Sequence, residues 1–453
     1  MTMVHFYCNI SKCRSLLVAA LTGVGMLTAS AQSINIVNEL TGEDGTAYDG
    51  IMSQTISPNH KYIAGTVTNI AEFKNGIFIY DMETGDYVIQ GDVNPLGSKL
   101  FTVTDEGLAV GYNGDSPEGF SVTAQTMSID GTTTKLETPE ESNSYACGIT
   151  DDGKILVGYY ASTMDYVNHA CIWKDGKLET LPTLTEEETG TSITGSEANF
   201  VSGDGSVIAG SLLDGDNTEL FALWRLQDDG SYECELIGNK YYSRDGTDPE
   251  RPYKQFQIAG LSHNGKYAAL KLGVKELQHA ARYDVEAGTF EECMHEESGE
   301  LTDAGAIDAV SIADDGTLLG NCVTSAGWVN KPCIWKAGEK TPQLISTICP
   351  DLEQLAAFDA TGFNFAMCIT PDGRYVTGYS DDSNKQAAMM NMNTAYVIDL
   401  YGTTVGISNH VADGVVNGEE ARYTIDGTRV NAPVKGLNIV KKADGKTVKV
   451  MVK

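Results

Sequence analysis

Acidic residues are the first groups in this sequence that could do chemistry. Asp214, Asp216 and Glu219 lie close together in the segment LLDGDNTE, where carboxylate oxygens could hold a hard cation. They lack the D-x-D-x-D-G spacing of a calcium loop. The pair Asp151–Asp152 falls in a turn, and neighbours on a strand would point to opposite faces. The sequence therefore predicts no metal site.

Motifs for other catalytic chemistry are absent from the sequence. The seven histidines include no HExxH, no two cysteines are spaced as CxxC, and there is no GxSxG. The segment 445–447 resembles the end of a phosphate loop, but Val440 stands where the first Gly is needed. We predict no catalytic residue and no cofactor, and a non-enzymatic protein is favoured. A carbohydrate-active enzyme stays open, because acidic residues could converge from distant parts of the chain.

Aromatic residues in long variable stretches are the predicted ligand contacts. Their rings offer flat apolar area with a polar tip, which suits contact with a carbohydrate or a protein. Packing beneath a loop is the competing interpretation for each single residue. The candidates are Tyr159, Tyr160, Tyr166, Tyr241, Tyr242, Tyr253 and Trp328.

A pattern that recurs seven times must position these residues. In its clearest copy, VSGDGSVIAG at 201–210, a Ser enters a turn built on Asp-Gly, an apolar run follows, and Gly ends the run. Asp-Gly supplies the positive φ of a hairpin turn, and the Ser or Thr can bond back to the turn backbone. The final Gly lets a bulge or another backbone come close. The copies end at residues 65, 111, 158, 210, 270, 320 and 378.

The spacing of the copies, 46 to 60 residues, suits a four-stranded propeller blade with its loops. A second apolar run with an aromatic end follows most copies, as in ACIWK at 170–174, and we expect this aromatic residue to pack between blades. The sequence predicts an all-β fold, with a seven-bladed β-propeller over residues 32–400 and a small C-terminal β-unit. An open solenoid is the alternative.

The blade geometry also predicts which face binds. A strand at 33–39 could close the ring beside 396–400. In up-and-down blades, connections between second and third strands emerge on the same face as connections between blades. We call this the long-loop face, and the face with the Asp-Gly turns the tight-turn face. The long variable stretches belong to the long-loop face, where we expect the ligand.

The N-terminus and the charge distribution predict an exported protein. Lys12 and Arg14 precede an apolar run at 16–27 and an A-x-A site at 29–31, so residues 1–31 are a predicted signal peptide. Residues 32–417 carry 21 basic and 58 acidic side chains, a formal charge of −37, which excludes nucleic acid as a partner. We expect a cell-surface or extracellular location, with the periplasm as the alternative.

Eight cysteines follow the predicted signal peptide. Cys171 and Cys333 occupy the same place in two repeats, and Cys147 and Cys368 lie in predicted inner strands. Buried thiols fit all four and are favoured, while at least one disulfide stays open because export permits it.

Two parts of the chain resemble known families. The joint pattern S-x-D-G-x-x-I-x-G and A-x-x-W, over roughly 53–400, resembles HAF-type extracellular repeats, which implies propeller blades and transfers no catalytic residue. Residues 401–417 form a predicted linker. The tail at 418–453, with a hairpin at 423–430, the segment KGLNIV and a basic end, resembles the C-terminal sorting domains of type IX secretion cargo. That resemblance implies a type IX-like secretion machinery as a partner.

The hypothesis that these features favour is a secreted or surface-associated, non-enzymatic propeller that binds a glycan or a protein through its long-loop face. The alternatives are a carbohydrate-active enzyme, with acidic residues from several blades, and a structural component of an envelope assembly.

Overall fold

The computed structural model describes residues 31–403 and 419–452. Within these ranges it leaves out positions 95, 165, 245, 275–276, 294–306, 325–328, 388–389, 425–428, 431, 433 and 443–446. The chain divides into two compact units, one of which is Gln32–Gly402 and the other Met1–Ala31 with Thr403–Lys453. The predicted signal peptide, except Ala31, and most of the predicted linker lie outside the described residues. No helix in the described part is long and apolar enough to cross a membrane.

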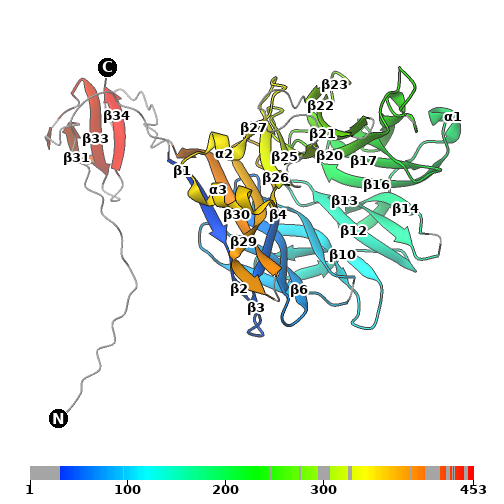
Figure 1. Ribbon diagram of the computed structural model, residues 1–453, viewed down its shortest axis with the longest axis horizontal. Helices are drawn as coiled ribbons and strands as arrows, with labels where there is room; N and C mark the ends of the chain where they lie inside the picture. Colours follow the sequence, from blue (N-terminus) through cyan, green and yellow to red (C-terminus); the bar gives the residue numbers. More distant parts are fainter. Residues whose placement is uncertain are drawn as a thin grey trace, which may run out of the picture. The chain divides into compact units, whose positions relative to one another are not determined.

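The larger unit is all-β, and its strands follow one another in antiparallel groups of four (Figure 1). A single parallel bridge between Leu220 and Phe256 joins the fourth and fifth groups. The seven repeats of the sequence correspond to the seven groups in the described residues. These are β4–β7 (Gly50–Ile56, Tyr62–Asn69, Lys74–Asp81, Tyr87–Gly91), β8–β11 (Lys99–Val103, Leu108–Gly114, Val122–Ser128, Thr133–Lys135), β12–β15 (Ser142–Ile149, Ile155–Ser162, Asn168–Lys174, Lys177–Thr180), β16–β19 (Ile193–Val201, Val207–Asp214, Glu219–Leu226, Tyr232–Leu236), β20–β23 (Gln255–Leu261, Tyr267–Val274, Leu277–Asp284, Thr289–Cys293), β24–β27 (Ile307–Ile312, Leu318–Thr324, Val329–Trp335, Gln343–Leu344) and β28–β30 (Asn364–Ile369, Tyr375–Ala387, Met390–Thr403) with β1 (Ala31–Val37).

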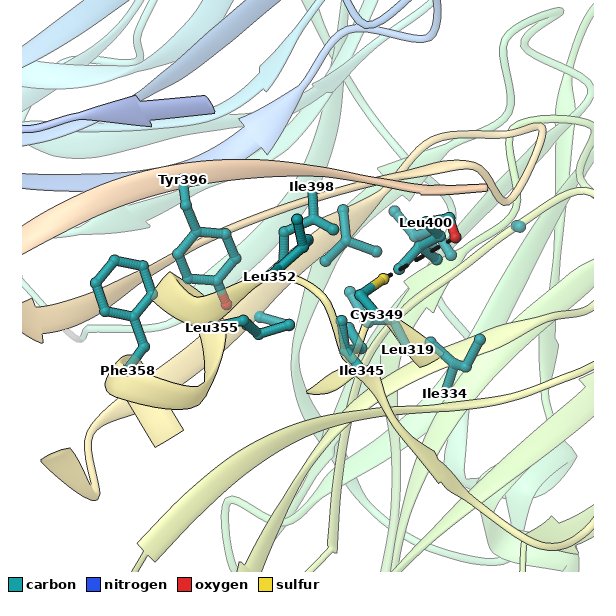
Figure 2. Packing of buried hydrophobic residues seen from close by; sticks show 14 residues of the cluster. Leu319, Ile334, Ile345, Cys349, Leu352, Leu355, Phe358, Tyr396, Ile398 and Leu400 are labelled. Carbon is teal, nitrogen blue, oxygen red and sulfur yellow. Dashed lines mark hydrogen bonds between the residues drawn. The ribbon is translucent and has the colours of Figure 1, made fainter. Parts of the chain in front are cut away.

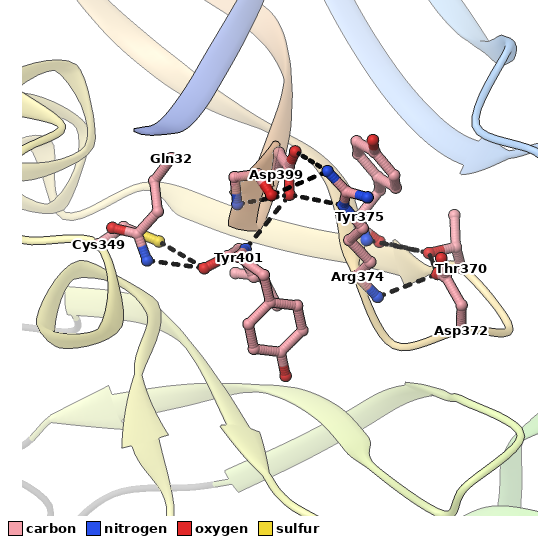
Figure 3. Close-up of polar contacts among 10 residues, drawn as sticks. Gln32, Cys349, Thr370, Asp372, Arg374, Tyr375, Asp399 and Tyr401 are labelled. Carbon is pink, nitrogen blue, oxygen red and sulfur yellow. Dashed lines mark hydrogen bonds and ion pairs between the residues drawn. The ribbon is translucent and has the colours of Figure 1, made fainter. Parts of the chain in front are cut away.

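The first strand of the unit completes its last sheet, as predicted. β1 pairs with β30, and the last sheet contacts the first through β29 and β4. The Gln32 side chain donates from Nε2 to the carbonyl of Leu400 at 2.7 Å (Figure 3). It also donates to the carbonyl of Ile348 at 2.9 Å. The first and last sheets therefore meet and close the ring, and the N-terminal strand β1 is paired with β30 rather than left as a separate edge strand.

An ion pair fixes the end of the last sheet (Figure 3). Arg374 donates from Nε to Asp399 Oδ1 at 2.9 Å and from Nη2 to Asp399 Oδ2 at 2.7 Å. Asp399 Oδ1 also accepts the backbone N–H of Gly402 at 2.9 Å. Burial alone would raise the pKa of Asp399, but the arginine and the backbone donors hold it below its ordinary value. The carboxylate thus ties the turn before β29 to the end of β30.

Two helices fill the space between the sixth and seventh groups (Figure 2). They are α2 (Ile345–Ile348) and α3 (Glu353–Thr361), in the connection from β27 to β28. Leu355 is fully buried, and the Phe358 ring stacks on Tyr396 at 5.8 Å between centroids. Together with β30 they form an apolar cluster, so this connection is part of the core. Short helices α1 (Glu186–Thr189) and η1 (Gly238–Lys240) and the hairpin β2–β3 (Leu40–Thr41, Ala47–Tyr48) lie in other connections.

The repeated turn forms the predicted hydrogen bonds. In the copy at 201–210, the Ser202 hydroxyl donates to Asp204 Oδ1 at 2.7 Å and accepts the N–H of Val207 at 3.0 Å. Gly205 takes a positive φ of 75°. The first copy has His60 where the others have Gly, and His60 still adopts a φ of 58°. The turn therefore depends on this conformation at every copy, including the one that lacks Gly.

A β-bulge follows the same rule in every group. In each first strand, the residue three positions before the Ser, Thr or Ala that enters the turn has no partner on the second strand. We call these residues the bulge ring. They are Gln54, Phe101, Cys147, Asn199, Ala259, Val310 and Met367.

The final Gly of the repeat stands opposite the bulge. Gly111 pairs with Leu100, and a Cβ on Gly111 would overlap the carbonyl oxygen of Lys99. The final glycines of copies one, three, four, six and seven also pair with the residue before their own bulge. A Cβ on any of them would meet the carbonyl oxygen of the residue two positions before the bulge. The close approach predicted for this Gly is thus confirmed, and the fifth copy, which has Leu270, is the exception.

Interior side chains also follow the sequence analysis. Trp173 is fully buried and packs against Val110 and Leu136 of the neighbouring group, and its indole N–H donates to the carbonyl of Glu137 at 2.7 Å. The packing role of the aromatic end is confirmed there.

All eight cysteines after residue 31 are free thiols. Six of them are buried, and the sulfur atoms of Cys322 and Cys333 lie 2.8 Å apart.

The tail contains a four-stranded antiparallel sheet in the order β32-β31-β33-β34. Its described strands are β31 (Glu419–Thr424), β32 (Arg429–Val430), β33 (Gly436–Lys442) and β34 (Thr447–Val452). This agrees with the small C-terminal β-unit expected from the sequence.

The contact between the final Gly and the bulge predicts that replacing this Gly lowers the stability of the fold. Gly111→Ala should lower the free energy of unfolding by about 1–3 kcal/mol, because the new methyl group would push the backbone of β8 away from β9. Chemical denaturation of the purified protein measures the change. The matched control is Gly91→Ala, where the nearest atom is 3.9 Å away and no change is expected. Equal stability of the two variants would contradict the rule.

Candidate functional site

All seven first strands converge on two adjoining cavities. The larger, which we call the loop-side cavity, has a volume of about 410 Å³ and is lined by every residue of the bulge ring. The smaller, the turn-side cavity, has about 220 Å³ and is lined by the residues that follow the ring, among them Ile56, Ile149 and Ile312. Because every group contributes to both, the cavities lie where the first strands meet, at the axis of the propeller.

Hydrogen bonds between blades link the turns around the turn-side cavity. Asp151 donates its backbone N–H to the carbonyl of Gly203 at 2.9 Å, and Gly203 donates to that of His263 at 2.7 Å. The His263 side chain lies 2.7 Å from Asp151 Oδ1, and all three residues line the turn-side cavity. Three successive turns are thereby held together on the tight-turn face.

The loop-side cavity reaches the other end of the axis. Lys99 is the first residue of β8 and Glu219 the first of β18, and both strands start on the long-loop face. The cavity therefore lies at the end of the axis that faces the long loops, which is where a ligand bound on that face would enter.

Charged side chains enter the loop-side cavity from several groups. Lys271 Nζ pairs with Asp308 Oδ1 at 2.9 Å. Glu197 is half-buried and accepts a hydrogen bond from Asn168 Nδ2 at 2.6 Å. Lys99 places its ammonium over the Phe101 ring, 4.6 Å from the centroid. The cavity thus combines polar recognition groups with apolar walls.

Burial favours the neutral forms of Glu197, Lys99 and Cys147. It raises the pKa of the Glu197 carboxyl, opposed by the Asn168 hydrogen bond and reinforced by the charge of Glu219. It lowers the pKa of Lys99. It raises the pKa of the Cys147 thiol to about 12, so this bulge-ring thiol is no nucleophile at physiological pH.

Phe101 lines this cavity, and three further half-buried aromatic rings continue from it along the second and third groups. Phe101 contacts Tyr112 at 6.1 Å between centroids, Tyr112 contacts Tyr145 at 5.0 Å, and Tyr145 stacks on Tyr159 at 4.8 Å. We call them the aromatic ladder. Lys99 lies over the first ring, and the charge of Glu197 acts on Tyr145 and Tyr159. The ladder connects the two polar groups along an apolar surface.

The predicted tyrosines at 159–166 occupy three different environments. Tyr159 belongs to the aromatic ladder. Tyr160 stacks on His169 at 4.9 Å, and its hydroxyl lies 3.3 Å from Thr180 Oγ1. Tyr166 projects from the loop between β13 and β14 and is 80% exposed. None of the three lines the loop-side cavity, and Tyr159 is joined to Phe101 only through the ladder; the role of all three in binding stays a prediction.

The predicted tyrosines at 241–253 pack around a second aromatic cluster. Tyr241 stacks on Phe256 at 4.9 Å. Tyr253 is buried, and its hydroxyl donates to Glu292. The Tyr242 hydroxyl lies 3.3 Å from Thr218 Oγ1. These contacts belong to the apolar core between the fourth and fifth groups. Trp328 lies outside the described residues.

The acidic segment at 214–219 is organised as a turn. Asp214 Oδ1 accepts the backbone N–H of Asp216 at 2.9 Å and that of Thr218 at 2.8 Å. Asp216 pairs with Arg244 at 3.0 Å. No group of three or more potential metal ligands is found among the described residues.

The residues that the sequence analysis missed are those that line the loop-side cavity. Lys99 and Glu197 each lie five residues before the residue that enters the turn, as does Asp308, the partner of the lining residue Lys271. Phe101 and Asn199 lie three residues before it. The repeat therefore contained a usable signal. Polar or aromatic residues at these two positions of an otherwise apolar strand mark side chains that point to the axis.

Comparisons with known proteins concern the fold alone. No protein-family model matches the sequence, and no curated protein matches it. Similar solved structures include TolB from Acinetobacter baumannii, at 12% identity over 56% of this chain and 58% of that chain, with a TM-score of 0.37. Oligogalacturonate lyase from Vibrio parahaemolyticus is 13% identical over 81% of this chain and 97% of that chain, with a TM-score of 0.49. The β-propeller domain of the trilobed protease from Pyrococcus furiosus is 13% identical over 69% of this chain and 97% of that chain, with a TM-score of 0.43.

The closed series of four-stranded antiparallel sheets makes this chain a β-propeller protein. The all-β propeller predicted from the sequence is confirmed. The chain spans 58% of the length of the TolB structure.

The burial of Glu197 predicts a stability that depends on pH. The pKa of Glu197 is raised in the folded state, so the folded protein loses stability at any pH above that value, where the carboxyl is ionised. Below the unfolded-state pKa of about 4.3 the carboxyl is protonated in both states and the loss disappears. Glu197→Gln should therefore raise the melting temperature at pH 8, and the gain should disappear by about pH 4. Differential scanning calorimetry across this range measures it. Glu233→Gln, at an exposed position on β19, is the control that should change nothing.

Proposed function

We propose that this protein binds a glycan at its long-loop face, with a sugar ring seated in the loop-side cavity. The observation that carries the proposal is a cavity lined by polar groups and by Phe101, the first ring of the aromatic ladder. A sugar ring has apolar C–H faces and a polar rim. Aromatic side chains cover such faces, while carboxylates, amides and ammonium groups bond to the hydroxyls.

A glycan suits this site better than a folded protein does. The cavity is concave and about 410 Å³ in volume, which is the size of a small-molecule site. A protein partner normally needs roughly 800 Å² of contact on each side, over a broad surface. Protein binding through the outer loops, where Tyr166 is exposed, is the broader alternative.

A second candidate function is glycan cleavage. Glu197 and Glu219 line the same cavity, and the charge of Glu219 raises the pKa of Glu197. A carboxyl that retains its proton can act as a general acid, and a second carboxylate can act as a base or nucleophile. Turnover of a polysaccharide that is abolished by both Glu197→Gln and Glu219→Gln would favour the enzyme over the binding protein.

The binding proposal predicts the effect of removing one ladder ring. Tyr145→Ala should weaken the affinity for a bound glycan about tenfold, because one stacking surface is lost. A glycan array followed by calorimetric titration of the hits gives the affinity. Tyr87→Ala, on an outer strand, is the control and should bind as the unaltered protein does. A loss in Tyr166→Ala together with full affinity in Tyr145→Ala would place the site on the outer loops instead.

We also propose that the protein is exported to the cell surface or the medium, and that its repeats are of the HAF type. The A-x-A site at 29–31, the acidic body and the joint turn and A-x-x-W pattern support this. The basic end of the tail and its KGLNIV segment support a role for a type IX-like machinery.

The export proposal predicts where a shortened chain stops. A chain without residues 418–453 should accumulate in the periplasm as a folded propeller, because the larger unit, Gln32–Gly402, keeps its own core. Cell fractionation with immunoblotting measures the distribution. Unchanged amounts at the surface and in the medium would contradict the role of the tail.

A further inference from the structure

Lys99 is a cation in the loop-side cavity without an anionic partner. It begins β8, lines the cavity and covers the Phe101 ring at 4.6 Å. The described residues form no ion pair with it. A partly desolvated ammonium that lacks a counter-ion loses hydration without a full replacement, and the aromatic ring compensates for only part of the loss.

The other lysine of the same cavity shows what a satisfied cation looks like there. Lys271 Nζ pairs with Asp308 at 2.9 Å, and both residues are half-buried. Elsewhere, the buried Arg282 pairs with Glu291 at 3.0 Å. In a body with a formal charge of −37, carboxylates for Lys99 are abundant, yet the fold brings none into contact with it.

We propose that the ligand supplies this missing anion: the loop-side cavity recognises an acidic sugar. The carboxylate or sulfate ester of a pyranose pairs with Lys99, while the ring lies against Phe101 and the neighbouring rings of the aromatic ladder. This inference rests on the proposed glycan binding and specifies the ligand class. Lys99 acts with Phe101 because its ammonium lies directly over that ring, so an anion bound there brings the attached sugar to the aromatic surface.

Glu197 sets the orientation of the sugar in this site. Its carboxyl acts on the far rings of the ladder, Tyr145 and Tyr159, whereas Lys99 covers the first ring. An acidic group placed beside Glu197 would be repelled, and sugar hydroxyls would be accepted. The acid therefore points to Lys99 and the hydroxyl groups to Glu197 and Asn199, which both line the cavity.

The charge of the whole body limits the length of the ligand. A long polyanion would approach a surface with many more carboxylates than cations and would be repelled. A monosaccharide acid, or an acidic residue at the end of a neutral chain, places a single charge at the single unpaired lysine of this cavity. We therefore expect short ligands with one acidic group.

The test is a calorimetric titration of the whole protein with glucose, glucuronate and glucose 6-sulfate. Glucuronate, the sulfate ester or both should bind at least tenfold more tightly than glucose, and the comparison of the two acids distinguishes a carboxylate from a sulfate as the anion. Lys99→Met should remove the preference for the acid while glucose binding persists. Lys99→Arg should retain the preference.

Lys271→Met is the matched control. It removes the same charge from the same cavity, but from a lysine that already has a carboxylate partner, so the acid preference should persist. Equal affinity for glucose and both acids, or an acid preference that survives Lys99→Met, would overturn this inference and leave glycan binding intact. Failure of all three sugars and of a glycan array to bind would overturn the proposed function as well.

Discussion

The close approach of the final Gly to a β-bulge is the interaction on which the rest of this structure depends. A strand that carries an extra residue bends and twists, and its partner must leave room for the displaced carbonyl. At Gly111 and Gly378 that room exists only because there is no Cβ. The bend turns each first strand toward the axis, and the turn that follows begins three residues later. The same local steric condition recurs in six of the seven copies, and the fifth, with Leu270, keeps the bulge without it.

The bulge geometry also divides the repeat into residues that shape the blade and residues that line the cavity. The turn and the final Gly are the constrained positions, since φ and the carbonyl contact limit the residues that fit, and only His60 and Leu270 depart from Gly there. The bulge residue has no such constraint, because its side chain projects into a cavity. The bulge ring accordingly contains an amide at Gln54, an aromatic ring at Phe101, a thiol at Cys147 and a methyl group at Ala259. Binding specificity can vary at these positions without a change of fold.

Local patterns made most of the fold predictable from the sequence. The Asp-Gly turns, the close approach of the final Gly and the closing strand each depend on a few neighbouring residues. The apolar packing of α3 was missed, because the connection at 345–363 carries no copy of the repeat and its contacts come from Tyr396 and other distant residues. Tyr253 was expected as a surface candidate because it lies in a long connection, yet Phe256 and Phe290 draw it into the core.

The cavity could not be derived from the sequence, for a geometric reason. Lys99 and Glu197 are far apart in the chain, and only the ring of first strands brings both to one cavity. Neither pairs with the other. Burial lowers the pKa of Lys99 and raises that of Glu197, so keeping either group charged costs stability. A core position would be filled more stably by apolar residues. In the proposed complex, a ligand that carries an acidic group and hydroxyl groups would compensate Lys99 and Glu197 for this cost.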